Sequence, residues 1–225
     1  MSYQPEHDPY LPIRERMVAE QLAARSIVDA RVLDAMRTIP RHLFVPEELQ
    51  ARAYEDRPLP IGAGQTISQP YMVALMTQLL HLDEQDRVLE IGVGSGYQTA
   101  VLSYIAGSVI GIERIPSLAK EAERRLQTLG CENVEIVIGD GSLGYAPAAP
   151  YTAILVAAAA PYIPRALFDQ LADRGRLVIP VGLGDEQVLE YGWRRGGSFH
   201  IQRTIGVRFV PLIGEEGFDT NDATC

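Results

Sequence analysis

The stretch Arg87-Val-Leu-Glu-Ile-Gly-Val-Gly-Ser-Gly96 decides the fold of this 225-residue chain. Its apolar first half, residues 87–91, predicts a short buried strand, and the glycines that follow permit the tight turn by which a strand enters a helix. In an open parallel sheet, ligands bind in the crevice at the carboxyl ends of the strands. The glycine turn is therefore the first candidate for a binding site.

Strands and helices alternate beyond this turn. After a helix near residues 98–106, short apolar runs predict further strands, with helices between them at residues 116–129 and 164–172. These strands cover residues 109–113, 134–138, 153–156 and 175–179, followed by 187–194 and 199–209. The alternation predicts an α/β fold whose mostly parallel, seven-stranded sheet has helices on both faces. We expect the last two strands to be antiparallel and to close one edge.

The N-terminal part of the chain predicts a helical extension. Residues 13–38 carry apolar residues at helical spacing, interrupted near Ser26, and Asp29 is placed to cap the second helix. Prolines and glycines punctuate residues 40–70, which we interpret as loop with short structured pieces, before a helix near residues 71–80. We expect three parts: an N-terminal helical segment with a functional loop (1–70), a core (71–213) and a C-terminal tail (214–225).

The composition argues against several classes of protein. The net charge of −9 provides no basic footprint for a nucleic-acid backbone. Only two cysteines occur, which is too few for a disulfide framework or a zinc site and suits a reducing compartment. The stretch from Met1 to Tyr10 has no apolar signal-peptide region, and no apolar run is long enough to span a bilayer. We expect a cytoplasmic monomer without a metal and without a nucleic-acid or membrane partner.

Acidic residues accompany three successive strand ends: Glu90 precedes the glycines, Glu113 ends the second strand and Asp140 follows the third. The spacing GxGxG differs from the dinucleotide fingerprint GxGxxG, and a carboxylate beside the turn would repel a pyrophosphate. S-adenosylmethionine has no phosphate and suits this site, with Glu90 near its amino-acid end, Glu113 at its ribose and Asp140 at its adenine amine. Taken singly, Glu113 and Asp140 are equally consistent with solvated strand ends. The predicted cofactor-binding residues around the turn are Glu90, Gly92, Gly94, Ser95, Gly96, Glu113, Asp140 and Gly141.

A second region makes the prediction specific. Residues 53–72, which contain Gly64-Gln-Thr-Ile-Ser-Gln-Pro70, resemble the protein-L-isoaspartate (D-aspartate) O-methyltransferase family almost residue for residue. Ile39-Pro-Arg-His-Leu-Phe-Val-Pro46 and Val207-Arg-Phe-Val-Pro-Leu212 continue the likeness, which spans roughly residues 13–213. The resemblance implies a Rossmann-like class I S-adenosylmethionine methyltransferase with an altered strand order near its C-terminal edge. It also implies methyl transfer to the carboxyl group of L-isoaspartyl residues in damaged proteins and peptides, which initiates their repair.

The resemblance places the active-site serine at Ser68, and it implies that Thr66 is a further cofactor-binding residue, located between cofactor and substrate. A carboxylate is ionised near neutral pH, so the acceptor needs no general base. The Ser68 hydroxyl would bond one carboxylate oxygen and direct the other at the methyl group, although a turn-stabilising hydroxyl is the alternative. Two apolar stretches are candidate walls of a groove for an extended peptide, and plain packing explains each residue equally well. These predicted substrate-binding residues are Pro58, Leu59, Pro60, Ile61, Val207, Phe209 and Val210.

Two positions depart from the family pattern, since Thr152 stands where relatives commonly have aspartate and Ala157 where they have threonine. Both lie near the fourth strand, where they alter either the floor on the cofactor side or only the local packing, and we favour packing. They keep open a related aspartyl methyltransferase that modifies one dedicated peptide. A small-molecule or RNA methyltransferase, a cofactor-binding adaptor without activity and a nicotinamide oxidoreductase are weaker alternatives, because of the acidity, the specific loop and the glycine spacing.

Overall fold

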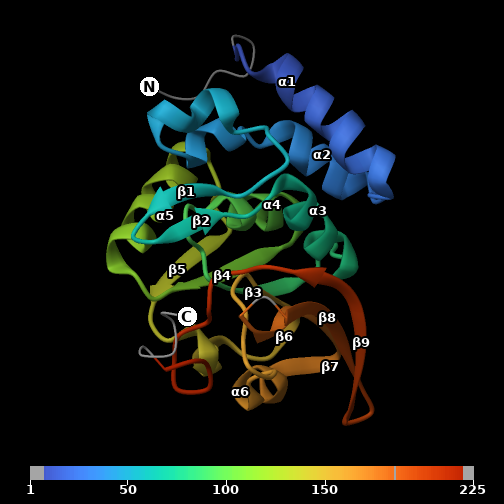
Figure 1. Cartoon of the computed structure of the whole chain (residues 1–225). Helices are drawn as coiled ribbons and strands as arrows, with labels where there is room; N and C mark the ends of the chain where they lie inside the picture. The colour runs from blue at the N-terminus through green and yellow to red at the C-terminus, as the bar shows by residue number, and fades with distance from the viewer. Residues whose placement is uncertain (1–7, 185, 220–225) are drawn as a thin grey trace.

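The computed structural model describes residues 8–184 and 186–219 of the chain. In this part, seven strands form one sheet in the order β5-β4-β3-β6-β7-β8-β9 (Figure 1). The pairs among β3 to β7 are parallel, whereas β7–β8 and β8–β9 are antiparallel, which confirms the predicted fold class. The strands are β3 (Arg87–Ile91), β4 (Ser108–Glu113), β5 (Val134–Ile138), β6 (Tyr151–Val156), β7 (Leu171–Leu183), β8 (Glu186–Arg195) and β9 (Ser198–Val207).

Helical elements cover both faces of the sheet. The buried hydrophobic side chains form two clusters, a larger and a smaller one. Alternate residues of a strand point to opposite faces of the sheet, so Val88 belongs to the larger cluster and Leu89 to the smaller one. The larger cluster packs beneath α2 (Ala30–Thr38), α3 (Pro70–Leu79) and α4 (Tyr97–Ile105), and receives Leu126 from α5 (Pro116–Thr128). The smaller cluster receives Leu167 from α6 (Arg165–Asp169). None of the helices within residues 8–184 and 186–219 has the length and hydropathy needed to cross a membrane.

The N-terminal extension begins with α1 (Leu11–Arg16), which continues as a π-helical turn (Met17–Leu22) and a 3-10 turn (Ala23–Arg25). Ser26 then adopts a left-handed conformation with φ of 70°, at the predicted interruption. Val18 of this extension belongs to the same buried cluster as Val88 of the sheet. The division at residue 70 stays a prediction, since one core runs across it.

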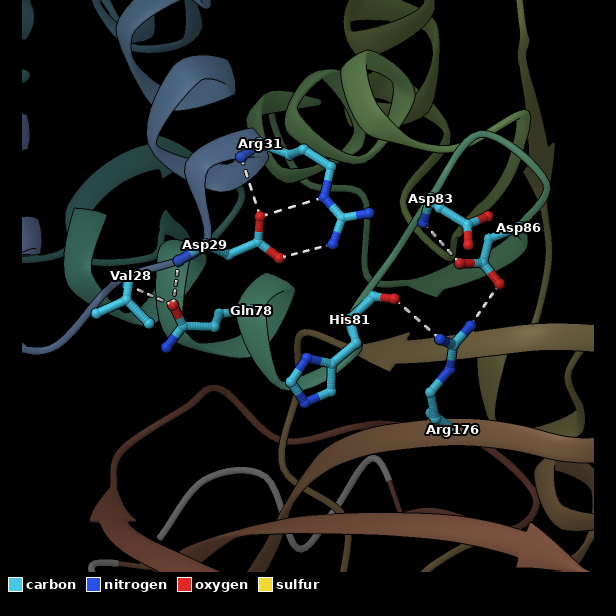
Figure 2. Close-up of polar contacts among 8 residues, drawn as sticks. All are labelled: Val28, Asp29, Arg31, Gln78, His81, Asp83, Asp86 and Arg176. Atoms are coloured by element: carbon cyan, nitrogen blue, oxygen red, sulfur yellow. Dashed lines mark hydrogen bonds and ion pairs between the residues drawn. The ribbon is translucent and has the colours of Figure 1, made fainter.

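Gln78 of α3 ties the start of α2 to the core (Figure 2). Its Oε1 accepts hydrogen bonds from the backbone N–H groups of Val28 (2.7 Å) and Asp29 (2.9 Å). The Asp29 carboxylate in turn accepts from the N–H of Arg31 at 2.9 Å, so Asp29 caps α2 as the sequence predicts. The segment between α3 and β3 is tied to β7 in a similar way: Arg176 of β7 donates to the carboxylate of Asp86 and to the carbonyl of His81 (Figure 2).

Two sequence-based expectations differ from the structure. Residues 40–70 contain, besides two 3-10 turns (Arg41–Phe44 and Glu47–Arg52), a hairpin of β1 (Leu59–Gly62) and β2 (Gln65–Ile67) that was not predicted as strands. The helix expected over residues 164–172 is too long, because α6 ends at Asp169. Leu171 is buried and pairs with Tyr151 of β6, so parallel pairing extends β7 into the expected helix.

The outermost strand β9 carries an irregularity in its pairing. Its register with β8 shifts between Val188 and Glu190, the signature of a bulge. Beyond this strand, residues 214–218 are held by backbone hydrogen bonds, including Gly214 N–H to Phe218 O at 3.3 Å. The remainder of the predicted tail, 220–225, lies outside the described residues, as do residues 1–7.

We expect Asp29→Ala to lower the free energy of unfolding by about 1 kcal/mol, because α2 loses its capping carboxylate. Burial raises the pKa of Asp29, but the hydrogen bonds and charge of Arg31 outweigh it and lower the pKa below its ordinary value. The difference from wild type should therefore persist at neutral pH and vanish as pH falls through that lowered pKa. Urea denaturation at neutral pH and at a pH below the lowered pKa of Asp29 tests this prediction. Glu20→Ala, at an exposed position, is the control. An equal difference in the free energy of unfolding at the two pH values would contradict a capping role for the Asp29 carboxylate.

Candidate active site

Two clefts adjoin at the carboxyl ends of β3, β4 and β6. The first, called here the glycine-turn cleft, lies against the turn after β3, and the second, the loop cleft, lies beside the segment between β2 and α3. Thr66, Ala157 and Val210 line both clefts. Ligands that fill the two clefts are therefore brought into contact across these shared walls.

Backbone groups shape the glycine-turn cleft. Gly92 and Gly94 line it with φ of 86° and 56°, in the left-handed region that favours glycine. A Cβ atom at Gly94 would lie 3.2 Å from the side chain of Ile61, which covers the turn from β1. The N–H of Gly94 donates to the carboxylate of Glu113 at 2.8 Å, which fixes the turn to the end of β4.

Glu113 faces this cleft with its carboxylate already oriented. Only 6 % of the residue is exposed, and its other oxygen accepts from the N–H of Ile115 at 2.9 Å. Each carboxylate oxygen retains a further lone pair, so Glu113 is able to accept hydroxyl hydrogens from a ligand. The apolar part of the lining suits a flat ring and comprises Ile91, Ile112, Ile115, Ala158, Val210 and Leu212.

The remaining residues predicted at the turn occupy different places. Gly141 lines the glycine-turn cleft, whereas Ser95 is buried and Gly96 precedes α4 as its N-cap. The carboxylate of Asp140 accepts from the N–H (2.9 Å) and hydroxyl (2.7 Å) of Ser142 and from the N–H of Glu215 (2.8 Å). Asp140 thus ties down the segment after β9, and its contact with an adenine amine stays a prediction.

Glu90 is fully buried in β3, and neither of its carboxylate oxygens has a hydrogen-bond partner among residues 8–184 and 186–219. Burial raises the pKa of Glu90 to about 8; the Thr99 hydroxyl opposes this shift and the Glu113 carboxylate adds to it. Glu90 does not line the glycine-turn cleft. Its predicted place beside the amino-acid end of a cofactor remains untested.

The loop cleft gathers most of the predicted substrate-binding residues. Ser68 lines it together with Pro58, Val207, Phe209 and Val210. The other three lie elsewhere: Leu59 is buried in the core, Pro60 is exposed and Ile61 covers the glycine turn. The two predicted walls, far apart in sequence, therefore do meet around the serine.

One side chain that shapes this cleft escaped the sequence analysis. Gln187 of β8 is only 7 % exposed, and its Oε1 accepts from the N–H of Phe209 at 2.7 Å. Its Nε2 donates to the carbonyl of Phe209 at 3.2 Å and to that of Gly184 at 2.9 Å. Gln187 thereby clamps both backbone groups of a wall residue. In the sequence, nothing distinguishes Gln187 from any other polar residue of a predicted edge strand.

The two departures from the family pattern lie in different settings. The Thr152 hydroxyl accepts from the N–H of Arg87 at 2.8 Å and links the beginnings of β3 and β6. Ala157 instead lines both clefts. Thr152 therefore has a structural contact outside the clefts, whereas Ala157 forms part of the candidate site.

Comparisons with known proteins agree with this geometry. The model of the protein-L-isoaspartate(D-aspartate) O-methyltransferase family matches residues 13–217. The protein-L-isoaspartate O-methyltransferase of Methanoculleus marisnigri is 54% identical over 213 residues, which cover 95% of this chain and 97% of that protein. The Methanoregula boonei protein of the same name is 55% identical over 209 residues, with 92% and 95% covered.

Solved structures show the same likeness. A structure described as protein-L-isoaspartate O-methyltransferase matches with a TM-score of 0.82 at 30% identity, covering 91% of this chain and 67% of that one. A Plasmodium falciparum chain in complex with S-adenosyl-L-homocysteine matches with a TM-score of 0.78 at 28% identity, covering 89% and 98%. The likeness thus includes the N-terminal extension as well as the sheet.

We expect Glu113→Gln to weaken binding of S-adenosylmethionine roughly tenfold or more, because an amide lacks the charge and one acceptor oxygen. Isothermal titration calorimetry measures the dissociation constant. Glu123→Gln, on the exposed side of α5, is the matched control. Unchanged affinity in Glu113→Gln would contradict the ribose-binding role.

We expect Glu90→Gln to stabilise the protein increasingly as pH rises from about 5 to 8. The raised pKa means that the folded chain keeps a proton that the unfolded chain releases, so wild-type stability falls with pH across this interval. The glutamine variant lacks this titration. Thermal unfolding of both proteins at several pH values provides the test, and a constant difference would refute it.

Proposed function

The chain belongs to the protein-L-isoaspartate(D-aspartate) O-methyltransferase family, and from this premise we propose how its residues carry out the family's reaction. It is an S-adenosylmethionine-dependent carboxyl O-methyltransferase that methylates L-isoaspartyl residues of damaged proteins and peptides and so initiates their repair. The observation that carries the mechanism is the junction of the two clefts at Thr66, Ala157 and Val210.

The glycine-turn cleft fits S-adenosylmethionine. Glycines at positions 92 and 94 leave the backbone accessible, and Glu113 offers acceptor oxygens to a ribose diol. The carboxylate also favours a cationic ligand over a pyrophosphate. Apolar side chains of Ile112, Ile115 and Leu212 offer surface for the adenine ring. These residues would hold the cofactor, which would supply its methyl group where the two clefts meet at Thr66.

Orientation is the main contribution of the chain to the reaction. S-adenosylmethionine supplies a methyl group on a positively charged sulfur, and the acceptor carboxylate is already ionised near neutral pH. Ser68 donates its hydroxyl hydrogen to one carboxylate oxygen, which leaves the other oxygen directed past Thr66 at the methyl group. Alignment of this kind is worth about 7–11 kcal/mol of the barrier. No residue has to remove a proton.

The substrate peptide lies extended in the loop cleft. Contacts through backbone groups tolerate many sequences, as repair of unrelated proteins requires. Gly206 and Val207 offer such groups at the end of β9, and the ring of Phe209 adds apolar surface. An isoaspartyl residue adds one methylene to the main chain and shortens the free carboxyl arm, so its carboxylate approaches the junction at a different depth from that of aspartate.

We further propose that the enzyme acts as a monomer. The acidic net charge of −9 and the small number of cysteines support a cytoplasmic enzyme without a nucleic-acid partner. Size-exclusion chromatography with light scattering tests the monomer directly.

We expect the purified protein to methylate the isoaspartyl version of a peptide and to leave the matched aspartyl version unmodified. Transfer of a labelled methyl group to several unrelated peptide pairs measures this. Activity on one isoaspartyl peptide alone would favour a dedicated enzyme, an alternative to which Ala157 at the junction draws attention. Equal labelling of both versions would refute the repair function.

Ser68→Ala should lower kcat by about 100-fold, because the acceptor loses its orienting hydrogen bond. The dissociation constant of S-adenosylmethionine should change little, since Ser68 lines only the loop cleft. Ser117→Ala, an exposed serine of α5, is the control. Parallel loss of turnover and cofactor affinity would contradict an orienting role for Ser68.

A further inference from the structure

A fully buried guanidinium lies behind the Ser68 loop. Arg41 is 0% exposed, and its Nε donates to the carbonyl of Ala53 at 2.7 Å. One terminal nitrogen donates to the carbonyl of Ser68 at 2.8 Å, and the other has no hydrogen-bond partner in the described part of the chain. The guanidinium carbon lies 4.9 Å from the ring centroid of Tyr97.

The burial of this charged side chain lowers the stability of the fold. A charge removed from water needs compensation, and no carboxylate among residues 8–184 and 186–219 forms an ion pair with Arg41. Burial accordingly lowers the pKa of Arg41 to about 10, which still leaves it charged near neutral pH. Two carbonyls and the Tyr97 ring contact the guanidinium, and the charge of Asp56 favours its charged form from beyond ion-pair distance. An apolar residue of similar length would avoid this cost.

The partners of Arg41 belong to both halves of the candidate site. The Ser68 carbonyl lies in the loop that presents the acceptor-orienting hydroxyl. Tyr97 is the first residue of α4 and directly follows the glycine turn, whose last glycine is its N-cap. Tyr97 is itself buried against Phe44, with ring centroids 5.4 Å apart. Arg41 therefore bonds the acceptor loop while resting on the helix that the cofactor turn begins.

We propose that Arg41 is a positioning residue for methyl transfer, which holds the Ser68 backbone at a fixed distance from the glycine turn. The proposal rests on the orienting role of Ser68 in the proposed function. Arg41 itself lines neither cleft and acts through Ser68, which lines the loop cleft. Its hydrogen bonds to the carbonyls of Ala53 and Ser68 fix the direction of the Ser68 hydroxyl. Its contact with the Tyr97 ring fixes the distance between the loop and α4.

The test uses Arg41→Met, which keeps the length of the side chain and removes its donors. Turnover of an isoaspartyl peptide should fall by about 100-fold, since a displacement of about 1 Å at a reacting centre costs this much. Affinity for S-adenosylmethionine should change less than threefold. Arg37→Met, an exposed arginine of α2, is the matched control and should retain normal turnover.

A double-mutant cycle with Ser68→Ala separates positioning from general structural support. If Arg41 acts through the serine, adding Arg41→Met to Ser68→Ala should lower kcat by less than threefold. A full additional loss in the double variant, or a parallel loss of cofactor affinity, would overturn the proposal. Normal turnover of Arg41→Met beside an impaired Ser68→Ala would overturn this proposal alone, whereas normal turnover of Ser68→Ala would overturn the serine assignment and this proposal together.

Circular dichroism and thermal unfolding establish that each variant is folded. If Arg41→Met does not fold, Arg41→Lys takes its place in the cycle, because lysine keeps the charge but reaches only one carbonyl with good geometry. A reduced kcat that is again non-additive with Ser68→Ala supports the proposal. Failure of both variants to fold would overturn it and mark Arg41 as a structural residue.

Discussion

The hydrogen bond from the Gly94 N–H to the Glu113 carboxylate anchors the whole site. It joins the turn after β3 to the end of β4, and the same turn starts α4 at Tyr97. Tyr97 supports Arg41, and Arg41 bonds the loop that carries Ser68. A displacement of the turn would therefore move the floor of the glycine-turn cleft and the support of the loop cleft together.

Several buried side-chain atoms in the described residues lack a hydrogen-bond partner. Both Glu90 oxygens, the Thr99 hydroxyl and one Arg41 nitrogen are buried without partners in the described residues. Such groups lower stability, and proteins tend to tolerate them where function requires a particular arrangement. Gln21 Oε1 and Arg176 Nε, which line neither cleft, are unpartnered as well, so the need for a functional arrangement is argued for Arg41 from its contacts and not from the missing partner alone.

The sheet was largely predictable because buried parallel strands appear as short apolar runs between amphipathic helices. The hairpin β1–β2 was not, since prolines and glycines at its ends resemble those of a loop, and its pairing depends on a turn with positive φ at Gly62 and Gly64. The start of β7 at Leu171 depends on pairing with Tyr151, a partner 20 positions away that local periodicity does not reveal. Ser68 was found through family resemblance, whereas Gln187 and Arg41 act through backbone atoms 22 and 27 positions distant.

The bulge in β9 has a consequence for an enzyme whose clients are damaged and partly unfolded. An exposed outer strand is a template on which extended chains align and accumulate as fibrils. The register shift opposite Val188 and Glu190 of β8 interrupts that template between Arg203 and Gly206, near the C-terminal end of β9. A chain that paired with the outer edge of β9 would therefore meet this interruption before it reached Gly206 and Val207, which line the loop cleft.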